Sequence, residues 1–366
     1  MQRRRLLAAA PFGLAALARP ALAQTPPPLQ WQLASDFVRA EGLMAAGADY
    51  LSRRVAALTD NRFQIVPSNA GQPVPAGGVL AAVKAGKVEM GYVRPALYTQ
   101  ATPALGFAGG MPFGLSARGQ MAWLLRGGGV EATNAVLAAF KCLGIPAGLT
   151  GNNFGGWWRQ DLKAAADLSG RKIAVQGPGA SVLAQLGAQP QALAPTDLVA
   201  ALQKGVVEAA FLGGPVDGDH LDLASAARIA YVPGWQAPAE SFWAVIAQDK
   251  WRDLAPAYKA ALQTACTETA AWMLALYDAL SPASLAKLEK AGVAVKPLPP
   301  EVLAALGKAA TAWFGTQAAS DAAFKKILEP WQKFVAAENA WFALDRPPAE
   351  AKPAPATAPV PAKAGK

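Results

Sequence analysis

Apolar positions in the first part of the chain follow two alternating spacings, one typical of strands and the other typical of helices. The strand spacing predicts strands over 31–35, 63–67 and 88–93. The helical spacing predicts helices over 41–58 and 79–85, which lie between these strands. Strands that alternate with helices indicate a mostly parallel sheet covered by helices.

The same alternation begins again after Gly151. A body of this length exceeds the roughly 250–300 residues that one hydrophobic core usually serves. The sequence therefore predicts an α/β protein with two lobes. The expected strands of the second stretch are 155–159, 172–175 and 209–212, and its expected helices are 180–186 and 196–204.

From Trp251 onward the chain is rich in Ala and its apolar residues recur at helical spacing. A long amphipathic helix is expected over 256–280, and at about 1.5 Å per residue it is long enough to span both lobes. A short strand over 293–295 and two helices over 300–314 and 321–342 follow. The last third is therefore predicted to be mainly helical.

This order of elements divides the chain between two lobes. Lobe I is expected to comprise 24–150 and about 239–275, and lobe II is expected to comprise 151–238 and about 276–345. Pro, Ala and Lys dominate 346–366. That composition cannot bury a core and is typical of a disordered tail.

The N-terminus has the three parts of an export signal. Three arginines over 3–5 precede an apolar stretch over 6–17, and Ala21-Leu22-Ala23 supplies an A-x-A cleavage site. We expect residues 1–23 to be removed and the protein to reach the periplasm. The apolar stretch is too short to span a membrane, and both the general and the twin-arginine export routes remain open.

The charge balance argues against a nucleic-acid partner. The chain has 34 Lys and Arg against 25 Asp and Glu, for a formal charge of +9, and four of its arginines lie in the predicted signal. The remaining basic residues are scattered and are not interleaved with aromatic residues. Such a distribution does not predict nucleic-acid binding.

The reactive residue types are few. Cys142 and Cys266 are the only cysteines, and they are either buried free thiols or, in an oxidising compartment, a disulfide. His220 is the only histidine, so a metal site of several histidines cannot form. We find no nucleophile beside a base and predict that the protein is not an enzyme.

A series of short motifs runs in a fixed order between about Trp31 and Trp341. They include Val88-Glu89-Met90-Gly91, Met111-Pro112-Phe113-Gly114, Gly155-Gly156-Trp157-Trp158-Arg159, Asp167-Leu168-Ser169-Gly170, Leu202-Gln203-Lys204-Gly205 and Tyr231-Val232-Pro233-Gly234-Trp235. The ordered set resembles the solute-binding proteins of tripartite ATP-independent periplasmic (TRAP) transporters. It is most similar to the branch that binds 2-oxo acids.

The resemblance implies a fold like that of periplasmic binding proteins, with two α/β lobes that are joined by a hinge and close on a ligand. The implied partners are a small organic solute and the TRAP membrane subunits. Related binders dimerise through a C-terminal helix, which implies a homodimer through 321–342. The alternative function is that of a periplasmic carrier or scaffold that has lost the ancestral ligand site.

The ligand residues of the family are replaced in this chain. Where the family has an arginine that clamps the ligand carboxylate, this chain has Ala174. Where it has an acidic residue and a tryptophan, and then a second acidic residue, this chain has Phe211, Leu212 and Ala237. Hard cations need several oxygen ligands, so we expect no bound metal and no cofactor.

These replacements predict an apolar cleft with a few amide groups, suited to a neutral, aromatic or lipid-like ligand. An alternative is that the ligand is still an acid and that Arg94 has taken over as its clamp. A third interpretation makes Arg94 a solvated loop charge. The candidate ligand-binding residues are Tyr92, Arg94, Tyr98, Asn153, Trp157, Ala174, Phe211, Leu212, Trp235 and Gln236.

Overall fold

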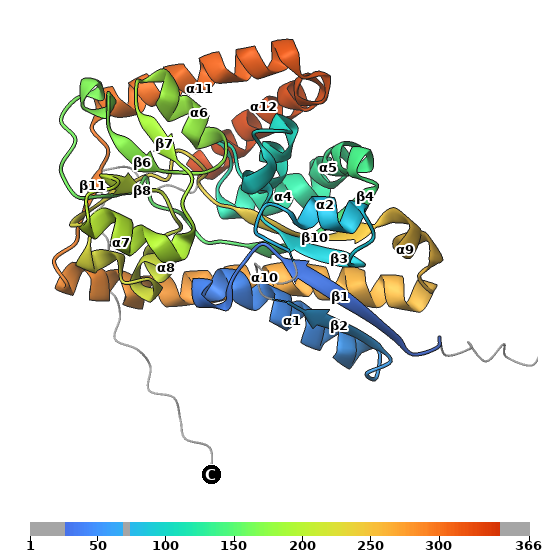
Figure 1. Cartoon of the computed structure of the whole chain (residues 1–366). Helices are drawn as coiled ribbons and strands as arrows, with labels where there is room; N and C mark the ends of the chain where they lie inside the picture. The colour runs from blue at the N-terminus through green and yellow to red at the C-terminus, as the bar shows by residue number, and fades with distance from the viewer. Residues whose placement is uncertain (1–25, 69–73, 345–366) are drawn as a thin grey trace, which may run out of the picture.

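The computed structural model describes residues 26–68 and 74–344. The predicted export signal and the predicted tail therefore lie outside the described residues. The described chain forms two β-sheets with helices around each of them (Figure 1). We call the first sheet and its helices lobe I, and the second sheet and its helices lobe II. The segment boundaries expected for the two lobes stay predictions.

The sheet of lobe I has five strands in the order β2-β1-β3-β10-β4. Helices α1 and α10 cover one face, and α2, α4 and α5 lie on the other face (Figure 1). Its strands are β1 (Leu29–Ser35), β2 (Phe63–Pro67), β3 (Met90–Val93), β4 (Cys142–Leu149) and β10 (Ser241–Ala247). Its helices include α1 (Leu43–Leu58), α2 (Val79–Lys84), α3 (Gly106–Gly109), α4 (Ala117–Arg126), α5 (Gly129–Leu137) and α9 (Gln248–Asp253).

The sheet of lobe II has six short strands in the order β11-β9-β5-β8-β6-β7. Its strands are β5 (Trp157–Trp158), β6 (Lys172–Ala174), β7 (Gln189–Gln191), β8 (Ala209–Ala210), β9 (Ile229–Val232) and β11 (Ala294–Pro297). Helices α6 (Pro178–Gln185), α7 (Leu198–Gln203) and α8 (Pro215–His220) connect them.

The strands of each sheet are mostly parallel, as predicted, and each sheet contains one strand that runs against the others. Strand β10 is antiparallel to β3 and β4, and β5 is antiparallel to β8 and β9. Both are the first strands after the chain crosses from one lobe to the other. They begin at the boundary between the lobes, whereas the other strands end there.

The long helix α10 (Pro256–Lys290) contacts α1 and β4 in lobe I and α8 in lobe II, and it runs beneath both lobes (Figure 1). It continues beyond the predicted end at residue 280, although Pro282 lies inside it. Ser284 and Leu288 are buried past this proline. Their burial helps to offset the roughly 3 kcal/mol that an internal proline costs a helix.

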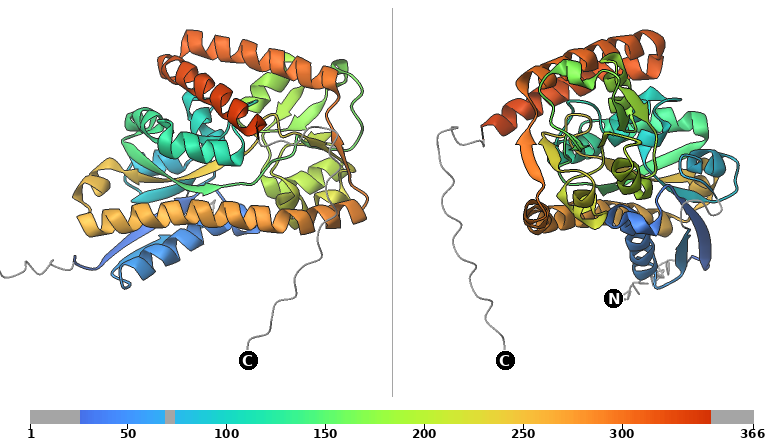
Figure 2. Two further views of the ribbon diagram at one scale, coloured as in Figure 1. Left: turned by 180° about the vertical axis from the view of Figure 1, so that it is seen from behind. Right: turned by 60° about the vertical axis from the view of Figure 1, so that its left-hand side comes forward.

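Two C-terminal helices cross back from lobe II to lobe I. Helix α11 (Pro300–Ser320) packs on α6, and α12 (Ala322–Ala343) packs on α4. Figure 2 shows α11 and α12 as an antiparallel pair on the side of the molecule opposite α10. The two lobes are thus connected by helices on both sides.

The two cysteines are buried free thiols, and the disulfide alternative is not realised. Cys142 lies opposite Ala247 in the sheet and belongs to one core cluster, and Cys266 belongs to a separate cluster. Burial raises the pKa of the Cys142 thiol to about 11. Its reactive thiolate form is therefore scarce at neutral pH.

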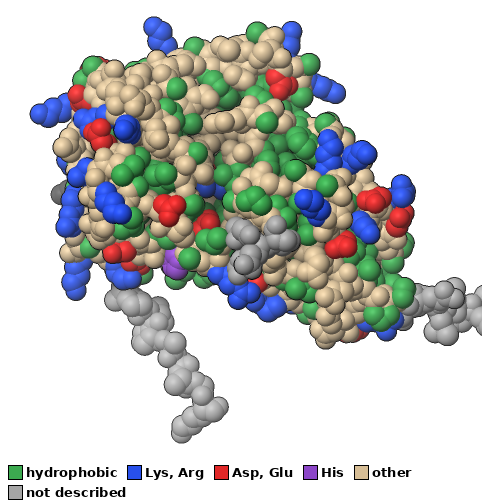
Figure 3. All heavy atoms as spheres, viewed as in Figure 1, with side chains coloured by type: hydrophobic (Ala, Val, Ile, Leu, Met, Phe, Trp, Pro, Cys, Tyr) green, Lys and Arg blue, Asp and Glu red, His purple; other side chains and the backbone are tan. Residues whose placement is uncertain are grey.

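The surface and the helices add two observations. On the face seen in Figure 3, basic and acidic side chains are dispersed among polar and apolar ones. Within residues 26–68 and 74–344, no helix combines the length and the apolar character that a membrane crossing requires.

Candidate functional site

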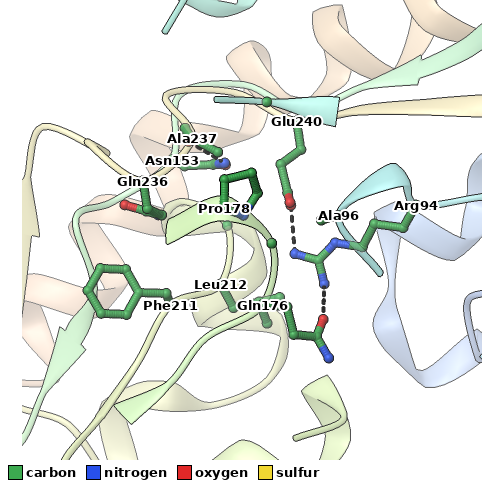
Figure 4. A pocket seen from close by; sticks show the side chains of 13 residues that line it. Arg94, Ala96, Asn153, Gln176, Pro178, Phe211, Leu212, Gln236, Ala237 and Glu240 are labelled. Atoms are coloured by element: carbon green, nitrogen blue, oxygen red, sulfur yellow. Dashed lines mark hydrogen bonds and ion pairs between the residues drawn. The ribbon is translucent and has the colours of Figure 1, made fainter. Parts of the chain in front are cut away.

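The ends of several strands meet at a pocket between the two lobes. Its empty volume is about 360 Å³, part of which is open to solvent. Parallel strands of an open α/β sheet place the residues that follow them at one edge, where ligands commonly bind. The pocket wall includes Arg94 after β3, Asn153 after β4, Gln176 and Pro178 after β6, Phe211 and Leu212 after β8, Gln236 and Ala237 after β9, and Glu240 before β10 (Figure 4).

Arg94 is the cation of this pocket wall, and its charge is already paired. Its Nη2 lies 2.7 Å from Glu240 Oε2, and the two side chains are only 9% and 10% exposed. Its Nη1 donates a hydrogen bond of 3.1 Å to Gln176 Oε1 in lobe II. Its Nε is buried and has no partner. The interpretation of Arg94 as a solvated loop charge is therefore wrong, because β3 delivers it into the interior.

Three further acidic groups lie near this guanidinium. Burial raises the pKa of Asp36 and of Asp217 to about 6, and it also raises the pKa of Glu41. Burial alone would lower the pKa of Arg94, but the charge of Glu240, with smaller contributions from Glu41 and Asp217, raises it. Negative charge therefore outweighs the single guanidinium in this region.

The raised pKa values predict that stability falls as the pH rises. The folded protein binds protons at Asp36 and Asp217 more tightly than the unfolded chain does, so the free energy of unfolding falls between about pH 4 and pH 6. We expect a loss on the order of 1–3 kcal/mol for each carboxyl group. Urea unfolding at a series of pH values measures it.

Two matched variants test whether Asp217 contributes to this fall in the free energy of unfolding. Asp217→Asn should flatten it, because Tyr277 Oη now donates to Asp217 Oδ1 over 2.7 Å and an amide oxygen can accept the same bond without titrating. Asp278→Asn changes an exposed carboxylate on α10 and should leave the slope as it is. A stability that rises from pH 4 to pH 6 would contradict the assignment.

The amides of the pocket wall are only partly engaged. Asn153 Nδ2 donates to the Ala237 carbonyl over 3.0 Å, and Gln236 Nε2 donates to the Phe154 carbonyl over 2.9 Å. Gln236 Oε1 is buried without a hydrogen-bond partner. A buried carbonyl oxygen of this kind can accept a hydrogen bond from an N–H or O–H group.

The rest of the wall is apolar. Phe211 and Leu212 follow β8, and Phe211 is held edge-on against Trp235 with ring centroids 5.8 Å apart. Ala174 lies at the end of β6 and lines a smaller hollow next to the pocket, together with Arg94 and Phe211. The position of the family's arginine thus faces this region with a methyl group.

Four of the predicted ligand residues lie elsewhere. Tyr92 is fully buried in lobe I and donates to the Ala147 carbonyl, and Tyr98 donates to Asp36 over 2.9 Å. Trp157 is buried in lobe II and donates to the Leu212 carbonyl, and Trp235 packs behind Phe211. The prediction placed Trp157 and Trp235 on the cleft wall because they lie near strand ends. The rings of all four residues fill the interior of the lobes instead.

Two polar residues of the pocket were missed by sequence reasoning. Glu240 lies directly before β10, whose residues are all buried. An acidic residue at the start of an apolar strand is an available signal, because a charge there must be paired if it is buried. Gln176 carries no comparable signal, since its role depends on Arg94 in the other lobe.

A family model of bacterial extracellular solute-binding proteins, family 7, matches residues 34–320. The chain belongs to this family. It is a solute-binding receptor of the TRAP type, and the family consists of periplasmic transport receptors rather than enzymes.

Three relatives cover most of the chain. A monocarboxylate 2-oxoacid-binding periplasmic protein of Nostoc sp. is 36% identical over 315 residues, which are 86% of each chain. A second relative is a TRAP solute-binding protein of Bordetella bronchiseptica, which is a mixed-occupancy dimer with copurified calcium and picolinate. It is 34% identical to this chain with a TM-score of 0.84, and the match covers 87% of this chain and 95% of the Bordetella chain. One of Colwellia psychrerythraea, with bound calcium and pyruvate, is 25% identical with a TM-score of 0.83 and covers 87% and 97%.

The comparisons confirm the predicted family and the two-lobed α/β fold of this TRAP receptor. The homodimer through the C-terminal helix stays a prediction, although the Bordetella relative is a dimer.

The resemblance places Phe211, Leu212 and Ala237 where the family has its cation site. These three side chains offer carbon, whereas a hard cation needs several oxygen ligands. Within the part of the chain that the structure describes, no group of three or more His, Cys, Asp or Glu side chains is arranged to hold a metal ion.

Proposed function

We propose that this TRAP receptor captures a small neutral solute in the pocket between its lobes and delivers it to the membrane subunits. The observation that carries the proposal is the Arg94–Glu240 pair, at 2.7 Å. The described pocket wall has one guanidinium, and a carboxylate of the protein already neutralises it. A ligand carboxylate would enter a region in which negative charge is in excess.

Removal from water costs an anionic ligand more free energy than a neutral one. An anion that leaves water loses its hydration, and only a well-placed cation or a set of donors can compensate it. A neutral ligand loses less, and it can use the apolar side chains of Phe211 and Leu212 together with the free Oε1 of Gln236. Such a mixture of apolar wall and few polar groups is usual in sites for small organic molecules.

Under this proposal, the chain differs from its relatives in the charge of the ligand that it binds. The Bordetella and Colwellia proteins hold picolinate and pyruvate, each with calcium. This chain shares their fold and their role as receptors. We infer that their acidic ligands do not transfer to it, because Ala174, Phe211 and Ala237 stand where the family has its arginine and its carboxylates.

The first experiment is native mass spectrometry of protein purified from the periplasm without unfolding. We expect a copurified neutral molecule to be retained and to be released on denaturation. The second is calorimetric titration with pyruvate and picolinate, with and without calcium, for which we expect no binding below millimolar concentration. Micromolar binding of either acid would overturn the proposal. A protein that retains nothing and responds to no neutral compound would instead favour the carrier or scaffold.

A further inference from the structure

The two sides of the Arg94 guanidinium differ in how they are used. Nε and Nη2 form an edge on which a carboxylate can bind with two parallel hydrogen bonds. Glu240 engages this edge through Nη2 alone, and Nε has no partner. Gln176 engages the other nitrogen from lobe II. Figure 4 shows Glu240 and Gln176 at opposite ends of the guanidinium. A ligand carboxylate that approached Arg94 would meet Glu240 at the same edge.

We infer that Glu240 is the residue that determines which ligand charge this receptor accepts, by holding Arg94 in an internal pair and so excluding carboxylates. The inference rests on the proposed neutral ligand and names the group that enforces it. Without Glu240, the Nε–Nη2 edge of Arg94 would be open to the carboxylate of an organic acid. Glu240 occupies that edge and leaves a site that selects for uncharged solutes.

The side chains of the other acidic groups near Arg94 accept hydrogen bonds from groups other than its guanidinium, so Glu240 can be tested by itself. Asp36 accepts hydrogen bonds from Tyr98 Oη and from the backbone N–H groups of Gly77 and Arg94. Asp217 accepts from Tyr277, and Glu41 accepts from a backbone N–H of its own turn. Glu240 is the acid whose side chain contacts the guanidinium directly. Its backbone N–H is fixed separately, by donation to a threonine hydroxyl.

The test is Glu240→Gln in the full-length protein, titrated with pyruvate and with picolinate in calcium-free buffer. The substitution keeps the shape of the side chain and an oxygen that can accept from Arg94, and it removes the negative charge. We expect binding of at least one acid to become tenfold or more tighter than in the wild type, together with a rise in melting temperature when that acid is present. Glu240→Ala should give the same gain in acid binding, so the test can be made with whichever of the two variants folds.

Two controls make the gain specific. Glu268→Gln makes the same change in the Arg54–Glu268 pair, which has a similar distance of 2.9 Å but lies on the outer surface of lobe I. It should not create acid binding. Combining Glu240→Gln with Arg94→Gln should abolish the gain, because the acid would then have no cation.

The outcomes separate this inference from the proposed function. If the wild type ignores acids and the folded Glu240 variants ignore them too, the role of Glu240 is overturned and the neutral ligand stands. If the wild type already binds these acids, the proposed neutral ligand is overturned. If the gain persists without Arg94, the acid binds elsewhere and the inference fails.

Discussion

Arg94→Ala is expected to lower the free energy of unfolding by about 3–5 kcal/mol, because it leaves a buried carboxylate without its partner. Glu240 is only 10% exposed at its side chain, so water cannot replace the lost guanidinium. The substitution also removes the hydrogen bond from Arg94 to Gln176 that joins the lobes. Urea unfolding followed by tryptophan fluorescence measures the change.

A double-mutant cycle separates the pair from its surroundings. Glu240→Ala should be the milder single change, because Arg94 keeps the electrostatic attraction of Asp36, Glu41 and Asp217. The double variant should be less destabilised than the sum of the two single changes, by more than about 1 kcal/mol. Additive effects would show that the two side chains are not coupled.

The partly exposed Arg54–Glu268 pair provides the comparison for this cycle. Its side chains are 34% and 37% exposed, so water screens both charges. Arg54→Ala should therefore cost about 0–1 kcal/mol. A cost similar to that of Arg94→Ala would mean that burial is not the reason for the difference.

Trp331→Ala is expected to destabilise the protein by about 3–5 kcal/mol, the usual range for removing a large aromatic residue from a core. Trp331 is 3% exposed and packs against Phe107 of lobe I, with ring centroids 5.4 Å apart, and against Phe314 of α11. Helix α12 is therefore fastened to lobe I although the chain reaches it from lobe II. Urea unfolding measures the loss.

Trp341→Ala is the matched control on the same helix. Trp341 is 57% exposed, so its removal creates no cavity and should change stability by no more than about 0.5 kcal/mol. If both variants lost a similar amount of stability, the loss would come from a weakened α12 and not from the lost packing of Trp331 on lobe I.

The proposed change in ligand charge would require few positions. In the proposed site, Ala174, Phe211 and Ala237 take the places that the resemblance gives to the family's arginine and acidic residues, while Arg94 and Glu240 place an internal pair on the same wall. The balance of buried charge can thus be altered while the strands that carry it remain in place. The fold fixes where ligand contacts are made, and the side chains fix which charge they accept.

Much of the fold follows from local spacing. Strands β1, β2 and β3 and helices α1 and α2 lie within two residues of their predicted bounds, because their apolar residues face one core at the period of each element. Strands β4, β7, β9 and β10 were missed. Pro146 lies inside β4, and β10 is buried along its whole length, so β10 shows no alternation between apolar and polar residues.

For the site, the sequence by itself determined which side chains the chain can offer: a residue such as Ala174 or Phe211 cannot clamp an acid or bind a cation through its side chain in any fold. What only the tertiary structure decided was which polar residues meet. Arg94 and Glu240 are 146 positions apart. They meet because β10 pairs antiparallel to β3 with Trp243 opposite Val93, which brings the end of one strand beside the start of the other. Pairing between strands so distant in sequence depends on the whole sheet, and no local pattern encodes it.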